Sequence, residues 1–291
     1  MDLDQRARST CLVRSAVIQY CDGQLLKFND NHDERGRFSE GDGTGASSRM
    51  KSTDDIVSRV VAQAAATGVK TNLSKITLCA SSADEKDAHL PKGDLAAYHN
   101  GSQEIVVATR VSDSIREVLK SGTIENIGQL TAMKILNHEI THAQGPPCSD
   151  LNYATTSGRV LEEGMTEAIA QRTLTQFTQD MGLARVTGPD MHVSSEGRFE
   201  SPAYRREVEA VDTLTSYLSK STGKSPVSYL KDWKFQTPPQ DRIRTIASDL
   251  MGAAKLPDDQ KKAVMWNLKV ALGGVGKGPN PMPGLLDGLK P

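Results

Sequence analysis

Long apolar runs, paired cysteines and an excess of charge of either sign are all lacking in this chain of 291 residues. No stretch approaches the roughly 18 apolar residues that a membrane-spanning helix requires. The four cysteines are scattered, at positions 11, 21, 79 and 148, so they predict neither a disulfide framework nor a cysteine metal site. The formal net charge of −1 gives no broad electrostatic surface for nucleic acid.

A secretory signal is also missing from the first residues. Residues 1–10 are charged, and the apolar run that follows is short and contains Arg14. We therefore expect a cytoplasmic protein, or one that is packaged into a virion, with no membrane and no nucleic acid among its partners.

Composition divides the chain into three parts. Residues 29–49 are polar and rich in glycine and cannot bury a core, so residues 1–49 are predicted to be an N-terminal segment and flexible linker. Residues 50–255 are predicted to form one domain. Residues 256–291 are predicted to be a C-terminal helix followed by a loose tail that is rich in glycine and proline.

Periodicity predicts helices and one small sheet, which is the α+β class. Residues 73–80 alternate as a strand does, residues 81–94 are predicted to be a loop, and Asn100-Gly101 predicts a type I′ hairpin turn between two apolar segments. The expected helices span residues 53–67, 113–120, 124–143, 159–181, 202–218, 228–233, 242–251 and 258–272.

One stretch carries chemistry: His138-Glu139-Ile140-Thr141-His142, an H-E-x-x-H pattern. Two histidines four residues apart lie on one face of a helix, about one turn from each other, so both rings can reach one metal ion. Glu139 points elsewhere and can take a proton from a water on that metal. Apolar residues flank the pattern at helical spacing, which predicts a buried helix on which unused polar groups would be costly.

A suitable third ligand follows at Glu163. A hydrolytic zinc site uses three protein ligands and keeps one position open for water. The second helical segment can pack antiparallel to the first and present Glu163 to the metal; the neighbouring Glu162 is a competitor for that role. Glu167 lies one turn further along the same face. There it can accept the hydrogen bond that a ligating histidine donates from its other ring nitrogen.

These two segments, H-E-I-T-H and E-E-G-M-T-E, resemble the gluzincin branch of the zinc metallopeptidases. The resemblance implies a zincin-like fold, mainly helical with a small mixed sheet over the active-site helix. It places Zn²⁺ on His138, His142 and Glu163, the general base on Glu139 and the acid behind the ligands on Glu167. It implies hydrolysis of a protein or peptide substrate through a metal-bound water. Glu163 precedes a glycine, as the family's ligand precedes a small residue.

Peptide hydrolysis also needs a donor for the developing oxyanion besides the metal. Three residues downstream of the motif are candidates: Tyr204, His192 and Tyr153. Tyr204 is preferred, because a tyrosine on the helix after the glutamate helix often has this role in similar enzymes. It is therefore predicted to be catalytic together with Glu139.

Two other functions fit the same residues. The phrase N-H-D-E-R-G-R-F-S-E-G in the predicted linker resembles a segment of phage structural proteins and polyproteins. The chain is then a phage virion or prophage structural protein with a non-catalytic zinc site, closed by a fourth protein ligand. Alternatively, it is a toxin or effector protease that uses the same site on a host target.

Overall fold

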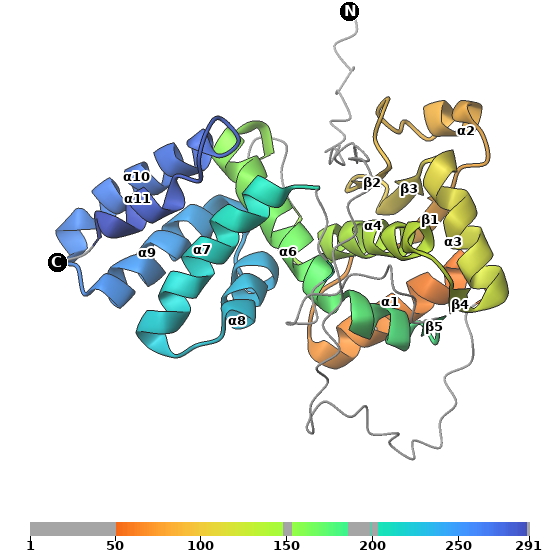
Figure 1. Cartoon of the computed structure of the whole chain (residues 1–291), viewed down its shortest axis with the longest axis horizontal. Helices are drawn as coiled ribbons and strands as arrows, with labels where there is room; N and C mark the ends of the chain where they lie inside the picture. Colours follow the sequence, from red (N-terminus) through yellow and green to blue (C-terminus); the bar gives the residue numbers. More distant parts are fainter. Residues whose placement is uncertain (1–50, 148–152, 186–198, 200–202, 290–291) are drawn as a thin grey trace, which may run out of the picture.

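The computed structural model describes residues 51–147, 153–185, 199 and 203–289. Within them the chain is a mainly helical α+β protein with a small three-stranded mixed sheet, as predicted (Figure 1). The predicted linker 1–49 lies outside the described residues. The helices are α1 (Thr53–Thr67), α2 (Ser82–Asp87), α3 (Thr109–Ser121), α4 (Ile127–Ala143), α6 (Thr156–Asp180), α7 (Arg205–Thr222), α8 (Pro226–Lys231), α9 (Arg242–Ala254), α10 (Lys261–Gly274) and α11 (Met282–Asp287), with short turns of other helical types at η1 (Asp232–Gln236), η2 (Pro239–Asp241) and η3 (Asp258–Gln260).

The three-stranded sheet has the order β1-β3-β2, from β1 (Lys75–Leu78), β2 (Ala96–His99) and β3 (Glu104–Val107). The central strand, β3, is parallel to β1 and antiparallel to β2. The predicted hairpin is therefore present, but the prediction of a two-residue Asn-Gly turn is wrong. The last pair is His99 with Glu104, so four residues connect the strands, and Gln103 takes the positive φ of 58°. A second, two-stranded parallel sheet pairs β4 (Thr123–Ile124) with β5 (Ala184–Arg185).

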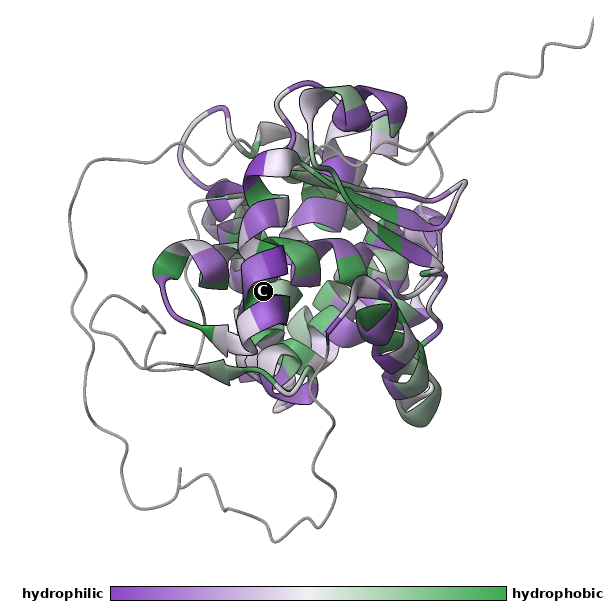
Figure 2. Ribbon diagram, turned by 90° about the vertical axis from the view of Figure 1, so that its right-hand side faces the viewer, coloured by the Kyte–Doolittle hydropathy of each residue, from purple (hydrophilic) through white to green (hydrophobic). Residues whose placement is uncertain are grey.

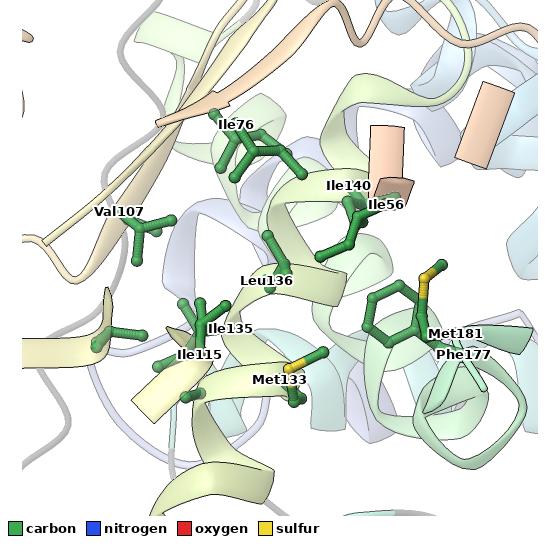
Figure 3. Close-up of a cluster of buried hydrophobic side chains, with 14 of the residues drawn as sticks. Ile56, Ile76, Val107, Ile115, Met133, Ile135, Leu136, Ile140, Phe177 and Met181 are labelled. Carbon is green, nitrogen blue, oxygen red and sulfur yellow. The ribbon is translucent and has the colours of Figure 1, made fainter. Parts of the chain in front are cut away.

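One hydrophobic cluster fills the space between the three-stranded sheet, α1, α3, α4 and the C-terminal half of α6. Its members come from the sheet face that looks toward α4 and from the predicted apolar stripe of that helix. Figure 3 shows Leu136, Met133 and Ile140 of α4 among residues of the other elements. Because α4 is buried on every side, its polar residues need partners inside the protein.

A second hydrophobic cluster joins the N-terminal half of α6 to the helices from α7 to α11. It includes Trp233, which is fully buried, and also Met282 and Leu286 of α11. The expectation of a loose glycine- and proline-rich tail is therefore wrong for the residues up to 289, since apolar side chains between the glycines dock on α7 and α10. The expected loop 81–94 is also corrected, because Ser81 and Asp84 form a capping box that starts α2.

The long helix α6 connects these two clusters. It has 25 residues, which at the rise of an α-helix makes it about 37 Å long. It packs against α4 on one side and α7 on the other (Figure 1). Gly164 allows the second contact, because a Cβ there would lie 2.6 Å from the backbone oxygen of Glu207 on α7. Figure 2 shows hydrophobic and hydrophilic residues alternating along the helices. In the part of the chain that the structure describes, no helix has the length and apolar character needed to cross a bilayer.

Candidate metal centre

His138, His142 and Glu163 come together where α4 and α6 pack against each other. All three side chains are buried, and each offers one ligand atom to a common point. The Nε2 atoms of the two histidines are 3.0 Å apart. The Glu163 Oε2 atom lies 3.4 Å from Nε2 of His138 and 3.6 Å from Nε2 of His142. These residues form a group that could hold a metal ion.

The size of this triangle fits a tetrahedral zinc site. Zinc binds histidine nitrogen and carboxylate oxygen at about 2.0–2.2 Å, so neighbouring tetrahedral ligands lie roughly 3.3–3.5 Å apart. The three measured separations bracket that range. The Oε2 atom of Glu163 is buried and accepts no hydrogen bond from the described residues. An isolated buried carboxylate oxygen is costly, and a cation at the centre of the triangle would satisfy it.

The other oxygen of Glu163 is already occupied. Tyr153 donates a hydrogen bond from its hydroxyl to Oε1 at 2.5 Å. This bond holds the carboxylate so that Oε2 faces the two imidazoles. Tyr153 was predicted as a candidate donor to the oxyanion, whereas in the structure its hydroxyl contacts the third member of the triad.

Behind His138 stands a buried carboxylate with its own partners. The Nδ1 atom of His138 lies 2.8 Å from Glu167, which is where the sequence places the supporting acid. Lys134 of α4 donates to both oxygens of Glu167 at 2.8 and 3.1 Å, and Gln171 donates to Oε1 at 2.8 Å. Such a partner fixes the ring orientation of a ligating histidine and leaves Nε2 for the metal.

Behind His142 stands a second buried carboxylate, that of Glu162. The Nδ1 atom of His142 lies 2.9 Å from Oε1 of Glu162. Lys234 of η1 contacts the same oxygen, and Arg242 of α9 contacts the other one. Glu162 thus points away from the triangle, and its oxygens are engaged elsewhere. The sequence allows Glu162 as a competitor for the ligand role, whereas in the structure its carboxylate contacts Nδ1 of His142, on the side of the ring away from the triad.

Charge and burial set the protonation of this centre. Burial alone would lower the pKa of His138, but the neighbouring carboxylates of Glu163 and Glu167 outweigh it and raise that pKa to about 9. Burial would raise the pKa of Glu167, but Lys134 and His138 bring it down to about 2. The positive charges of Lys234 and Arg242 likewise hold the pKa of Glu162 well below its usual range, despite burial. Without a metal, His138 is therefore an imidazolium between two carboxylates.

A pH dependence of metal binding follows from the raised pKa of His138. A ligating histidine must be neutral, so below pH 9 zinc has to displace a proton, and each lower pH unit should weaken apparent zinc affinity about tenfold. The imidazolium stabilises the metal-free fold below the unfolded pKa of 6.5, and this contribution is lost as pH rises through 9. The difference in Tm between zinc-loaded and chelator-treated protein should therefore grow from pH 6.5 to 9. A difference that shrinks over this interval would contradict the assignment.

Glu139 lies beside the triad but outside it. Its side chain is fully buried, and its Oε2 accepts a hydrogen bond of 2.9 Å from the backbone N–H of Tyr98 in β2. The bond holds the carboxylate between α4 and the edge strand of the three-stranded sheet. The structure therefore directs the carboxylate of Glu139, the residue after His138, at the sheet.

Tyr204 also reaches the centre. Its ring stacks on the ring of His138, with centroids 5.4 Å apart and planes within 6° of parallel. The residue precedes α7 with a φ of 53°, an uncommon conformation for a tyrosine that is found more often at functional sites. Burial raises the pKa of its phenol, and the charge of Glu163 raises it further, so the hydroxyl keeps its proton. The remaining candidate, His192, lies outside the described residues.

Four residues that hold the two supporting carboxylates were not singled out from the sequence: Lys134, Gln171, Lys234 and Arg242. Lys134 and Gln171 each lie four residues from a member of the site, on the same helix, so helical spacing was a usable signal. Lys234 and Arg242 lie 72 and 80 residues from Glu162, and no local pattern connects them to it.

The chain matches no known family model, no curated protein and no solved structure closely enough to establish a relationship. The function of the chain is therefore inferred from the geometry of the site and from the residues that form it.

Proposed function

We propose that this protein is a zinc-dependent peptidase. The observation that supports the proposal is the buried triangle of His138, His142 and Glu163 with Glu139 beside it. In the described part of the chain, these three are the only histidine, cysteine or acidic side chains that gather at one point. Three ligands leave a zinc ion one position for solvent and substrate, as a catalytic site requires.

Each residue then has a role in hydrolysis. His138, His142 and Glu163 hold the zinc, which when bound polarises a carbonyl and acidifies a water. Glu139 takes the proton from the attacking water and passes it to the leaving amine. Tyr204 keeps its phenolic proton and donates a hydrogen bond to the oxyanion.

The carboxylate of Glu139 is tied to strand β2 of the three-stranded sheet. Among the described residues β2 has β3 on one side only. The Leu95 carbonyl accepts a hydrogen bond from the N–H of Ala108, which directly follows β3. Because backbone groups point to alternate sides along a strand, the N–H of Tyr98 points away from β3, and it donates to Glu139.

A non-catalytic zinc site in a virion protein is the alternative from another class. It would need a fourth protein ligand, and the described residues provide three. A toxin or effector protease would have the same centre and would differ only in its target.

The test combines coordination with cleavage. X-ray absorption on the zinc-loaded full chain should give two imidazoles and one carboxylate with a remaining oxygen from solvent, and a peptide library should be cleaved by the zinc-loaded protein and not after chelation. A fourth protein ligand together with an uncleaved library would refute the proposal in favour of a structural site.

A further inference from the structure

The most deeply buried cations of the C-terminal helices lie against the metal centre. Lys234 is 1% exposed and Arg242 is 2% exposed, and both contact the carboxylate of Glu162. Burying two such charges costs free energy unless each charge has partners, so we expect this arrangement to have a function. The mechanism described above uses neither residue.

Arg242 connects Glu162 to the turn that carries Lys234. Its Nε donates to the Trp233 carbonyl at 3.0 Å, its Nη2 donates to the Lys234 carbonyl at 3.1 Å, and its Nη1 contacts Oε2 of Glu162. The turn η1 is a π-helical segment, a geometry that is rare and recurs at functional sites. The planar guanidinium thus fixes the backbone of η1 and the carboxylate in one geometry.

The two histidines are supported in different ways. The carboxylate behind His138 is held by Lys134 and Gln171, which belong to the same two helices, α4 and α6, as the triad. The carboxylate behind His142 is held only by residues of η1 and α9, among its contacts in the described structure. Apart from the hydroxyl of Thr166 on α6, 3.4 Å from its Nδ1, the orientation of His142 therefore depends on a separate part of the chain.

We propose that Lys234 and Arg242 are positioning residues of the metal centre. They hold Glu162 where it accepts from Nδ1 of His142, so that Nε2 of this ring faces the other two ligands. The C-terminal helices then contribute residues that orient a metal ligand, in addition to stabilising the fold. This inference rests on the proposed function in that it assumes zinc at the triad.

The decisive variant is Arg242→Met in the full chain. Lys234 and Arg242 bring two positive charges against one carboxylate, so this change leaves a balanced Lys234–Glu162 pair and the protein should still fold. Zinc affinity, measured by competition with a chromophoric chelator, should fall about tenfold to a hundredfold, the usual cost of losing support behind a ligand. The visible spectrum of the cobalt-substituted protein should change as well. Arg242→Lys should recover part of both.

Asp249→Asn is the matched control. Asp249 accepts a hydrogen bond from Trp233 at 2.8 Å, in the same turn and helix, but does not touch Glu162. It should lower Tm without changing zinc affinity or the cobalt spectrum. Lys234→Met should behave as Arg242→Met does, which gives a second measurement if one variant is poorly folded.

The proposal is overturned if Arg242→Met and Lys234→Met bind zinc within twofold of Asp249→Asn, or if Arg242→Lys loses as much affinity as Arg242→Met. These results differ from a failure of the proposed function, in which the unaltered protein itself would bind no zinc at His138, His142 and Glu163.

Discussion

Replacing Glu139 by Gln should lower the turnover of a cleaved peptide by about 10²- to 10⁴-fold, the range that a positioned general base supplies. The amide has the size of the carboxylate and can still accept the hydrogen bond from the Tyr98 N–H. It cannot take a proton from water. Because Glu139 belongs to the helix but not to the triangle of ligand atoms, zinc content should be unchanged.

The measurement pairs single-turnover cleavage with metal analysis of the same samples. Glu209→Gln provides the control, since Glu209 is exposed on α7 and pairs with Arg205. This control should keep full activity and full zinc. A Glu139→Gln protein that lost its zinc but kept its activity would show that the roles assigned to Glu139 and to the ligands are wrong.

The sequence was a good guide to α4 and its motif, because both depend on local spacing. Apolar residues at helical intervals predicted a buried helix, and the structure buries that helix from Gln129 to Ala143 except at Thr131. Burial in turn made three polar groups on one short segment informative. The four-residue spacing of His138 and His142 already implies that their rings meet on one face.

The choice between two adjacent glutamates was harder to make from sequence. Residues 162 and 163 differ by about 100° around a helix, so only one can face α4 in the right place. Gly164 is a physical clue, since the backbone of α7 passes too close for a side chain there. That contact fixes which way α6 is turned. It puts Oε2 of Glu163 in the triangle and turns Glu162 toward Lys234.

The prediction made from local composition was wrong for the end of the chain, for a related reason. Glycine and proline lower helix propensity, which is a weak local preference that tertiary contacts override. Residues 273–289 were expected to be loose, yet Met282 and Leu286 are buried against other helices. The contacts of Lys234 and Arg242 with Glu162 share this origin, because they exist only once distant helices have packed.

Exchanging the two glutamates one at a time should separate the ligand from its support. Glu163→Gln should weaken zinc binding on the order of 10³-fold. Zinc binding worth about 10–16 kcal/mol is divided among few ligands, so losing one costs several kcal/mol. Glu162→Gln should weaken it only about 10- to 100-fold, because the ring of His142 loses its orienting partner but not its metal-binding nitrogen.

The stability of the metal-free proteins should distinguish the same two variants. Glu162→Gln leaves Lys234 and Arg242 buried without a carboxylate, which should cost about 3–5 kcal/mol of unfolding free energy. Glu163→Gln removes one of the two carboxylates beside the His138 imidazolium, but Glu167 stays on that ring and Tyr153 can still donate to the amide oxygen, so it should lose less unfolding free energy than Glu162→Gln. Chelator competition and urea denaturation measure the two quantities. If Glu162→Gln proved the weaker zinc binder while Glu163→Gln proved the less stable fold, the ligand would be Glu162, and α6 would have to be rotated from the orientation that Gly164 and α7 impose.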